Sequence, residues 1–203
     1  MKKLLFVLIL LIFIIPIIFL ANKNFDGIKT PRLKNDISRV DVSGTYKITF
    51  DELVELLKEI DPTASIKVDN RVKKFTEQNG DIRDHYKSVI FSSHEIRGYF
   101  NEEKEHLTAV AVYSKFGISK AGKNTSEFNT TVEFDKGTIN NFKSKVLIVN
   151  NILNSSNSQK EMTKFLKNTI KKEIKSNQKG EVGDSTIYLY KDINSIVIEF
   201  IPK

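Results

Sequence analysis

Residues 186–200, T-I-Y-L-Y-K-D-I-N-S-I-V-I-E-F, indicate the class of fold more clearly than any other stretch of the chain. Apolar and polar side chains alternate on both sides of Asp192, a pattern typical of two antiparallel strands joined by a turn. One face of this hairpin is apolar and is predicted to face the core: Ile187, Leu189, Ile196, Ile198 and Phe200. The opposite face carries Thr186, Tyr188, Tyr190, Val197 and Glu199.

Tyr188 and Tyr190 are the first candidate functional residues. Exposed tyrosines on a sheet favour recognition of another protein, because the ring supplies apolar area and the hydroxyl group supplies a hydrogen bond. The alternative interpretation is that both faces of the sheet are covered. Burial of both rings would then exclude a protein-interaction surface at this place.

Alternating segments further upstream predict the rest of the sheet. Residues 94–113 are expected to form one hairpin around a polar turn. Residues 128–134 and the turn signal at 135–137 predict a second hairpin, whose return arm contains residues 146–149. Shorter strands are expected at 45–49 and 65–68, and the latter is followed by a helical turn around Val72 and Phe75.

The first predicted helix follows a capping box. In this motif a Thr side chain and a Glu three residues later bond the free backbone N–H groups at a helix start. Thr49 and Glu52 provide this pair. The helix is expected to end at residues 61–62, because proline disfavours helical geometry in the residue before it.

A second capping box, Ser158 and Glu161, predicts a helix over residues 159–175. The polar residues 150–158 form a joint before it, and the alternative is that the domain consists of two halves that meet there. The predicted fold class is therefore α+β: an antiparallel sheet built from hairpins with two helices packed on one face, preceded by an N-terminal hydrophobic helix.

An N-terminal apolar segment predicts export or membrane attachment. Residues 4–21 contain no charge and follow Lys2 and Lys3. As a helix with about 1.5 Å per residue, this run would span roughly 27 Å, close to the thickness of a bilayer hydrocarbon core. We expect a signal anchor; the alternative is a signal peptide cleaved after Ala21, although the bulky Phe19 makes a poor cleavage site.

The expected organisation has three parts. Residues 1–21 form the signal anchor or signal peptide, residues 22–39 a polar juxtamembrane linker, and residues 40–203 an extracytoplasmic α+β domain. The expected location is the cell membrane, with a single pass through residues 4–21 and the C-terminal domain extracytoplasmic. Secretion after cleavage is the alternative.

Composition argues against several kinds of chemistry. The chain has no cysteine, which excludes disulfides and thiolate catalysis. It also lacks the motifs of phosphate-binding loops and serine-hydrolase elbows. The three histidines, His85, His94 and His106, do not have the spacing of a metal site, and no cofactor or metal is expected. We therefore expect a protein without catalytic activity.

A lysine stripe on the predicted helix 159–175 is the second candidate site. Lysines recur there at intervals of three or four residues, which places them on one side of a helix: Lys160, Lys164, Lys167, Lys171 and Lys175. The stripe is either solvated or binds an anionic partner, such as a membrane surface, a wall polymer or an acidic protein. Nucleic acid is not expected, because the stripe lacks aromatic residues that stack on bases.

The predicted function is an anchored extracytoplasmic binding or accessory protein that contacts an anionic partner through the lysine-rich helix face. The first alternative is an inhibitor or immunity-type protein that binds another protein through its sheet. The second is a hydrolase whose catalytic residues meet only in the folded chain.

Overall fold

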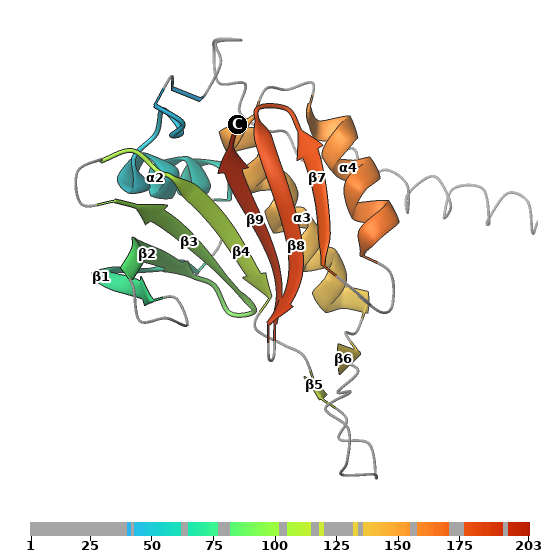
Figure 1. Cartoon of the computed structure of the whole chain (residues 1–203). Coiled ribbons are helices and arrows are strands. Elements are labelled where there is room, and N and C mark those ends of the chain that lie inside the picture. Colours follow the sequence, from blue (N-terminus) through green and yellow to red (C-terminus); the bar gives the residue numbers. More distant parts are fainter. Residues whose placement is uncertain are drawn as a thin grey trace, which may run out of the picture. The chain divides into compact units, whose positions relative to one another are not determined.

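An antiparallel sheet of seven strands, in the spatial order β1-β2-β3-β4-β9-β8-β7, forms the centre of the structure (Figure 1). The strands are β1 Lys67–Thr76, β2 Ile82–Ile90, β3 His94–Phe100, β4 Ala109–Ser114, β7 Gln178–Val182, β8 Ser185–Asp192 and β9 Ser195–Pro202. Two short strands, β5 Ile118–Ser119 and β6 Val132–Glu133, pair separately. The middle strand β4 pairs with β9, and this pair joins the strands β1 to β4 and the strands β7 to β9 into one sheet.

The computed structural model describes residues 40–41, 43–61, 65–76, 82–101, 105–114, 118–119, 132–133, 136–154, 158–170, 177–192 and 195–203. These residues all belong to one compact unit, Arg32–Lys203. The predicted anchor at 4–21 and linker at 22–39 lie outside them. Within the described part of the chain, none of the helices combines the length and the apolar character needed to cross a membrane.

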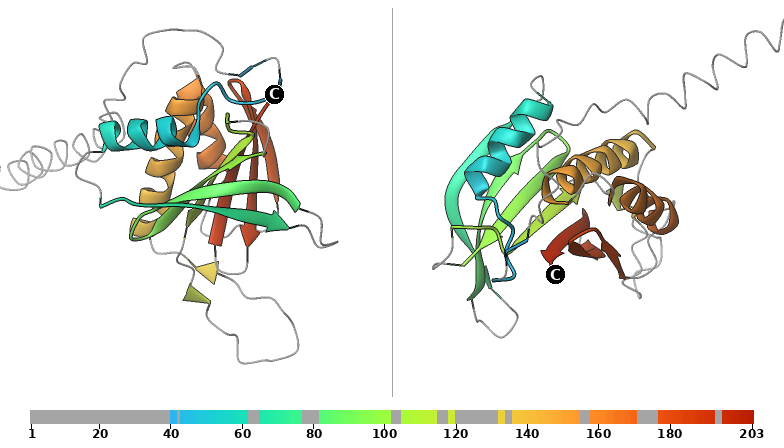
Figure 2. Two further views of the ribbon diagram at one scale, coloured as in Figure 1. Left: turned by 90° about the vertical axis from the view of Figure 1, so that its left-hand side faces the viewer. Right: turned by 90° about the horizontal axis from the view of Figure 1, so that it is seen from above.

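Three helices in the described ranges lie on one face of the sheet: α2 Phe50–Ile60, α3 Lys136–Leu153 and α4 Ser158–Thr169 (Figures 1 and 2). The capping box of α2 is confirmed, since the Glu52 backbone N–H donates to Thr49 Oγ1 at 3.2 Å and the Thr49 backbone N–H donates to Glu52 Oε2 at 2.8 Å. The fold is mixed α+β as predicted. The described residues form three helices, where the sequence predicted two packed on the sheet.

Helix α3 corrects the largest error of the sequence prediction. Residues 146–149 were expected to be a strand, and residues 150–158 a joint, yet α3 continues through Leu153. Its residues 146–150 are all buried, because α3 packs against β4, α2 and α4. A helix that is covered on several sides loses its polar face, and its short apolar run then resembles a buried strand.

Smaller differences concern the first strands and the last helix. Residues 67–76 are the continuous strand β1 and contain no helical turn, although the register to β2 shifts between Asp69 and Lys73. Residues 45–49 form isolated bridges at Tyr46 and Thr49 in place of a strand. Helix α4 ends at Thr169, before the predicted end at residue 175.

The inner face of the sheet, which we define as the face toward the helices, carries the main core. The apolar face predicted for the last hairpin is confirmed: Ile187, Leu189, Ile196, Ile198 and Phe200 are each at most 2 % exposed. Gly98 of β3 lies on this face directly under α2. A Cβ atom there would be 2.8 Å from Phe50 Cδ2 and 2.9 Å from Leu107 Cδ2, so only glycine permits this close packing.

A buried polar network joins the β7–β8 turn to the helices. The side-chain Oδ1 of Asn154 accepts hydrogen bonds from the Asp184 backbone N–H at 2.9 Å and from Ser185 Oγ at 2.8 Å, and its Nδ2 donates to Asn150 Oδ1 at 3.0 Å. Ser185 Oγ also bonds the Tyr46 hydroxyl group at 2.7 Å. Since buried polar groups are costly when unpaired, this paired network fixes the turn in one position.

Candidate functional site

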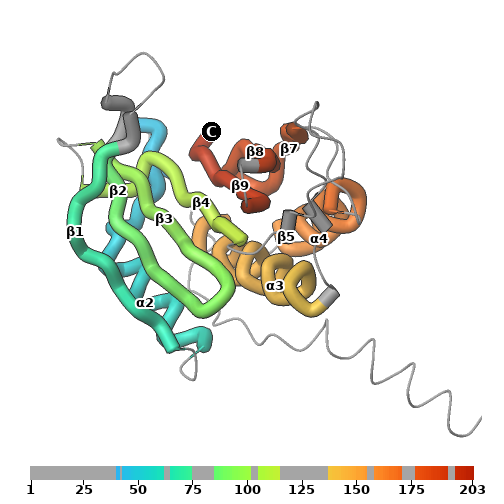
Figure 3. Tube along the Cα trace, turned by 90° about the horizontal axis from the view of Figure 1, so that it is seen from below, coloured from blue at the N-terminus to red at the C-terminus, as the bar shows by residue number. Residues whose placement is uncertain are grey.

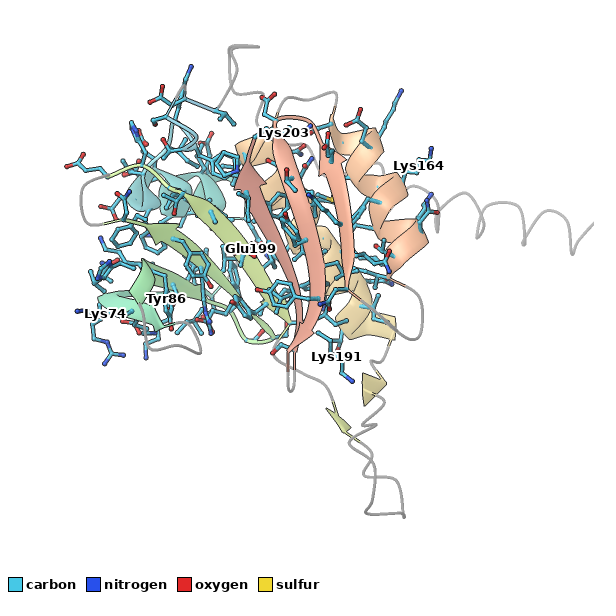
Figure 4. The ribbon with its side chains drawn as sticks, viewed as in Figure 1. Lys74, Tyr86, Lys164, Lys191, Glu199 and Lys203 are labelled. Atoms are coloured by element: carbon cyan, nitrogen blue, oxygen red, sulfur yellow. The ribbon has the colours of Figure 1, made fainter. Side chains whose placement is uncertain are left out.

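The outer face of the sheet, opposite to the inner face, is free of the three described helices. Figure 4 shows it from the front, with Tyr86 and Glu199 on the side of the viewer and the helices behind the strands. The sheet is strongly twisted between its two edges (Figures 2 and 3). The outer face is thus one twisted surface to which all seven strands contribute side chains.

Five of the six tyrosines of the chain gather on this outer face, as the strand register shows: Tyr86, Tyr99, Tyr113, Tyr188 and Tyr190. Tyr99 and Tyr113 are buried in a small apolar cluster with Ala109, Ala111 and Val197. Tyr86, Tyr190 and Ile201 pack against this cluster and are partly exposed. We call the five tyrosines together with Arg97 the outer-face patch.

Arg97 of β3 lies at the centre of the outer-face patch. Its guanidinium carbon lies 4.0 Å from the centroid of the Tyr113 ring and 4.9 Å from that of Tyr86. Its Nε donates to Glu95 Oε1 at 3.0 Å, and the two side chains are 24 % and 14 % exposed. A guanidinium group stacked between aromatic rings and paired with a carboxylate is held in one orientation.

Two groups at the centre of the patch, Tyr99 and Arg97, have shifted pKa values. Burial raises the pKa of the Tyr99 hydroxyl far above its usual value, and the neighbouring Tyr113, whose hydroxyl oxygen lies 2.8 Å away, raises it further. Burial by itself would lower the pKa of Arg97, but the hydrogen bond to Glu95 and the adjacent tyrosines outweigh it, and the pKa is raised. Arg97 is therefore charged and Tyr99 neutral at any physiological pH.

Charged residues border the patch at both edges of the sheet. On β1, Asp69 is bound by Arg71 Nε and by Lys73 Nζ, each at 2.9 Å. Their hydrogen bonds hold the pKa of the Asp69 carboxyl group well below its usual value. On β7, Lys179 Nζ lies 5.5 Å from the centroid of the Tyr188 ring. The surface thus has an aromatic centre with ionic groups on both sides.

The sequence prediction found two members of this patch and missed four. Tyr188 and Tyr190 lie on the outer face and remain partly exposed, so the burial that would exclude them is not observed. The missed residues are Tyr86, Arg97, Tyr99 and Tyr113. Arg97 and Tyr99 alternate along β3 with Ile96 and Gly98 of the inner face, which is a sequence signal for outward positions, but alternation does not show which strands lie beside β3.

The lysine stripe is described in part. Lys160, Lys164 and Lys167 are exposed on α4, opposite to the buried Met162 and Leu166. Lys171 and Lys175 lie outside the described residues. Burial and the charge of Lys167 lower the pKa of Lys143 on the neighbouring helix α3. The three described lysines are not joined to the outer-face patch, since α4 packs on the inner face, where Phe165 lies close to Gly180 of β7.

A buried histidine of β3 is a further polar feature of the described interior. His94 of β3 is 3 % exposed, its Nδ1 is bonded to Ser93 Oγ, and its Nε2 has no hydrogen-bond partner. A catalytic serine–histidine pair needs a third group that orients the base. Among the described residues no carboxylate bonds His94; the backbone of Asn141 is the other group near the ring, although not within strict hydrogen-bond geometry of Nε2. Across the described ranges, no group of three or more His, Asp or Glu side chains is placed to hold a metal ion.

Comparisons of the chain with models of protein families, with curated proteins and with solved structures give no match.

Proposed function

We propose that this chain is a membrane-anchored, extracytoplasmic binding protein without catalytic activity, and that it recognises another protein through the outer face of its sheet. The main support for this proposal is the outer-face patch. Tyrosine and arginine are the residues that contribute most often to binding energy at protein interfaces. Here they gather on the sheet face that no described helix covers.

Pre-organisation of the patch supports this proposal. Binding costs less free energy when the contacting side chains are already ordered. Arg97 is fixed by two rings and a carboxylate, and the Tyr99 and Tyr113 hydroxyl groups bond each other. The partly exposed rings of Tyr86, Tyr188 and Tyr190 surround this rigid centre and would make the contact.

The test is site-specific photo-cross-linking of the full chain in its native membrane. A photoreactive phenylalanine analogue replaces Tyr188 or Tyr190, because it keeps the size of the ring. The matched control carries the same analogue at Lys164, on the other side of the sheet. We expect discrete protein adducts from positions 188 and 190 and none from 164. A lack of adducts from both tyrosine positions would exclude the proposal.

A second candidate function is contact of α4 with an anionic surface. Its support is the exposure of Lys160, Lys164 and Lys167 on one side of a short helix. For the full chain in vesicles, we expect anionic lipid to protect Lys164 and Lys167 from an amine-reactive label, and neutral lipid to leave them accessible. Exposed Lys58 on α2 is the internal reference. Equal labelling in both kinds of vesicle would exclude this contact.

A further inference from the structure

We propose that the protein bound by the outer face is a second copy of this chain, docked face to face about a two-fold axis that runs along β4. This inference rests on the proposed function, because it names the occupant of the same surface. Three features of the described residues carry it: the place of β4 in the sheet, the order of charges across the strands, and the small residues on the axis.

The strand order gives the sheet a middle. β4 is the fourth of seven strands, with β3, β2 and β1 on one side and β9, β8 and β7 on the other. A two-fold rotation about an axis along β4, in the plane of the interface, places β1 of one copy over β7 of the other. It also places β2 over β8 and β3 over β9. Such a self-complementary contact is the usual interface of a homodimer.

The charges of the central row change sign across this axis. The strand register aligns one outer-face residue from each strand, in the order Asp69, Ser88, Arg97, Ala111, Glu199, Tyr188 and Lys179. The residues two strands away from β4, Ser88 on β2 and Tyr188 on β8, are not charged. The rotation therefore brings Arg97 of one copy opposite Glu199 of the other, and Asp69 opposite Lys179. Each pair occurs twice in the dimer.

The neighbouring row repeats the pattern. On one side of β4 it contains Tyr99, Tyr86 and the positive Lys73; on the other side it contains Thr186 and the negative Glu181. The rotation brings Lys73 opposite Glu181. Several outer-face charges are also paired within their own chain: Glu95 with Arg97, Asp69 with Arg71 and Lys73, and Glu181 with Lys203 Nζ at 3.2 Å. The contacts between copies would therefore extend these ion pairs across the interface. Lys67 is beyond the end of β7.

The shape of the surface also permits this contact. Ala109 and Ala111 lie on the axis, and both are small and buried. Tyr113, 6 % exposed, also lies on the axis, and Arg97 stacks on its ring, so the side chains that would make the contact there cover the buried alanines. Stacked sheets usually lie about 10 Å apart. Two sheets with the same twist stack with their strands nearly aligned. The partly exposed Tyr86, Tyr188, Tyr190 and Ile201 then meet around the centre.

The expected association is weak in dilute solution and stronger in a membrane. Seven strands at about 4.8 Å and three side-chain rows give a face of roughly 600 Å², below the roughly 800 Å² per partner of a standard interface. Two copies anchored in one bilayer have a high effective concentration, which offsets the small area. The test therefore uses the full chain in lipid vesicles.

The first test uses cross-linking between unique cysteines, which is possible because the chain has none of its own. Lys73→Cys and Glu181→Cys variants are reconstituted singly and as a mixture, and are treated with a short bismaleimide. We expect cross-linked dimers from the mixture alone, since identical positions lie about 29 Å apart across the seven strands. Lys164→Cys is the control. Equal dimer from single variants, or none from the mixture, overturns the proposal.

The second test exchanges the charges. One variant carries Lys179→Glu and Glu181→Lys; the other carries Asp69→Lys and Lys73→Glu. Each alone places like charges opposite each other, whereas the mixed pair restores every attraction. Measured by energy transfer between labelled copies in vesicles, we expect at least a tenfold loss of association for each variant alone and recovery in the mixture. Failure of the mixture to recover, with circular dichroism showing both variants folded, also overturns it.

The outcomes separate the two proposals. Photo-adducts at Tyr188 with the mass of a dimer agree with both. Adducts with a different protein, together with a negative cysteine test, retain the proposed function and overturn the second copy as partner. An absence of adducts overturns both.

Discussion

The guanidinium carbon of Arg97 lies 4.0 Å from the centroid of the Tyr113 ring, and the two residues are diagonal neighbours on adjacent strands. The residue directly opposite Arg97 is Ala111. Because Ala111 is small, the arginine side chain can lean across it onto the ring. One small residue in the middle strand thus makes the centre of the patch possible.

Replacing Arg97 by methionine should destabilise the domain. The substitution keeps much of the apolar stem but removes the stacking on Tyr113 and leaves the Glu95 carboxylate, 14 % exposed, without its ion pair. We expect a loss of about 2 kcal/mol in the free energy of unfolding. Urea denaturation followed by circular dichroism measures it. Arg97→Lys, which keeps the charge, should lose less than the methionine variant, and an equal loss would contradict the role of the charge.

The second prediction concerns the buried network at the β7–β8 turn. Asn154→Ala removes an acceptor and a donor at once, and so takes away the buried partner of Ser185 Oγ and of Asn150 Oδ1 and the part-buried partner of the Asp184 N–H. We expect a loss of about 3 kcal/mol in the free energy of unfolding. The control is Gln159→Ala, because Gln159 is partly exposed and its bond to Asn150 is long, at 3.3 Å. Similar losses for both variants would show that the buried network does not contribute more to stability than an exposed hydrogen bond.

Gly98 provides a packing prediction. Gly98→Ala places a methyl group 2.8 Å from Phe50 Cδ2, so α2 must move or the ring must change its rotamer. We expect a loss of about 2 kcal/mol in stability, as is typical of an overpacked core. The double variant Gly98→Ala, Phe50→Leu should lose less than the sum of the two single variants, because the leucine frees space. Strict additivity in thermal unfolding would show that the two sites do not touch.

His94 gives a prediction for the dependence of stability on pH. Burial lowers its pKa below the value of the unfolded chain, about 6.5; a backbone hydrogen bond with Asn141 partly opposes this shift, and the charge of Lys145 adds to it. The unfolded chain then binds more protons at this residue than the folded chain, so the contribution of His94 to stability is constant above about pH 6.5 and falls as the pH drops toward the folded pKa.

The measurement is urea unfolding between pH 5 and pH 8, about one unit or more on either side of this value. A His94→Asn variant should lack the part of the slope that begins near pH 6.5. Asp69 also titrates, but its loss of stability starts near the pKa of aspartate in the unfolded chain, about 3.9, and continues toward its lowered folded pKa, well below the range measured here. Identical slopes in the parent and the variant above pH 5 would contradict the assignment to His94.

Local sequence signals predicted the elements that are stabilised by local interactions or by a single buried face. Helix α2 follows from Thr49 and Glu52, whose hydrogen bonds lie within one turn. The last hairpin follows from the alternation of Ile187 and Leu189 with Tyr188 and Tyr190, since one face is buried and the other is not. In each case a segment of about ten residues contains the whole cause.

The prediction of a strand at residues 146–149 was wrong, because the interactions that make this segment helical are not local. The consecutive residues 146–149 are all apolar and three of them are β-branched, which is typical of a buried strand. They are helical because α3 packs against the sheet and against two other helices. The lysine stripe is intermediate: its period was read correctly over Lys160, Lys164 and Lys167, while the described helix ends before Lys171.

The sequence by itself determined which side chains point away from the core on strands with a regular alternation, because alternation has a period of two and needs no knowledge of neighbours. It thus placed Tyr188 and Tyr190 on outward positions, and the same period in residues 95–100 places Arg97 and Tyr99 there. The tertiary structure alone decided that these positions share one surface. Pairing of β4 with β9 joins segments that lie more than 80 residues apart, as between Val112 and Ile198, and no local pattern encodes such a contact. The aromatic centre and the alternating charges across the sheet exist because of that pairing.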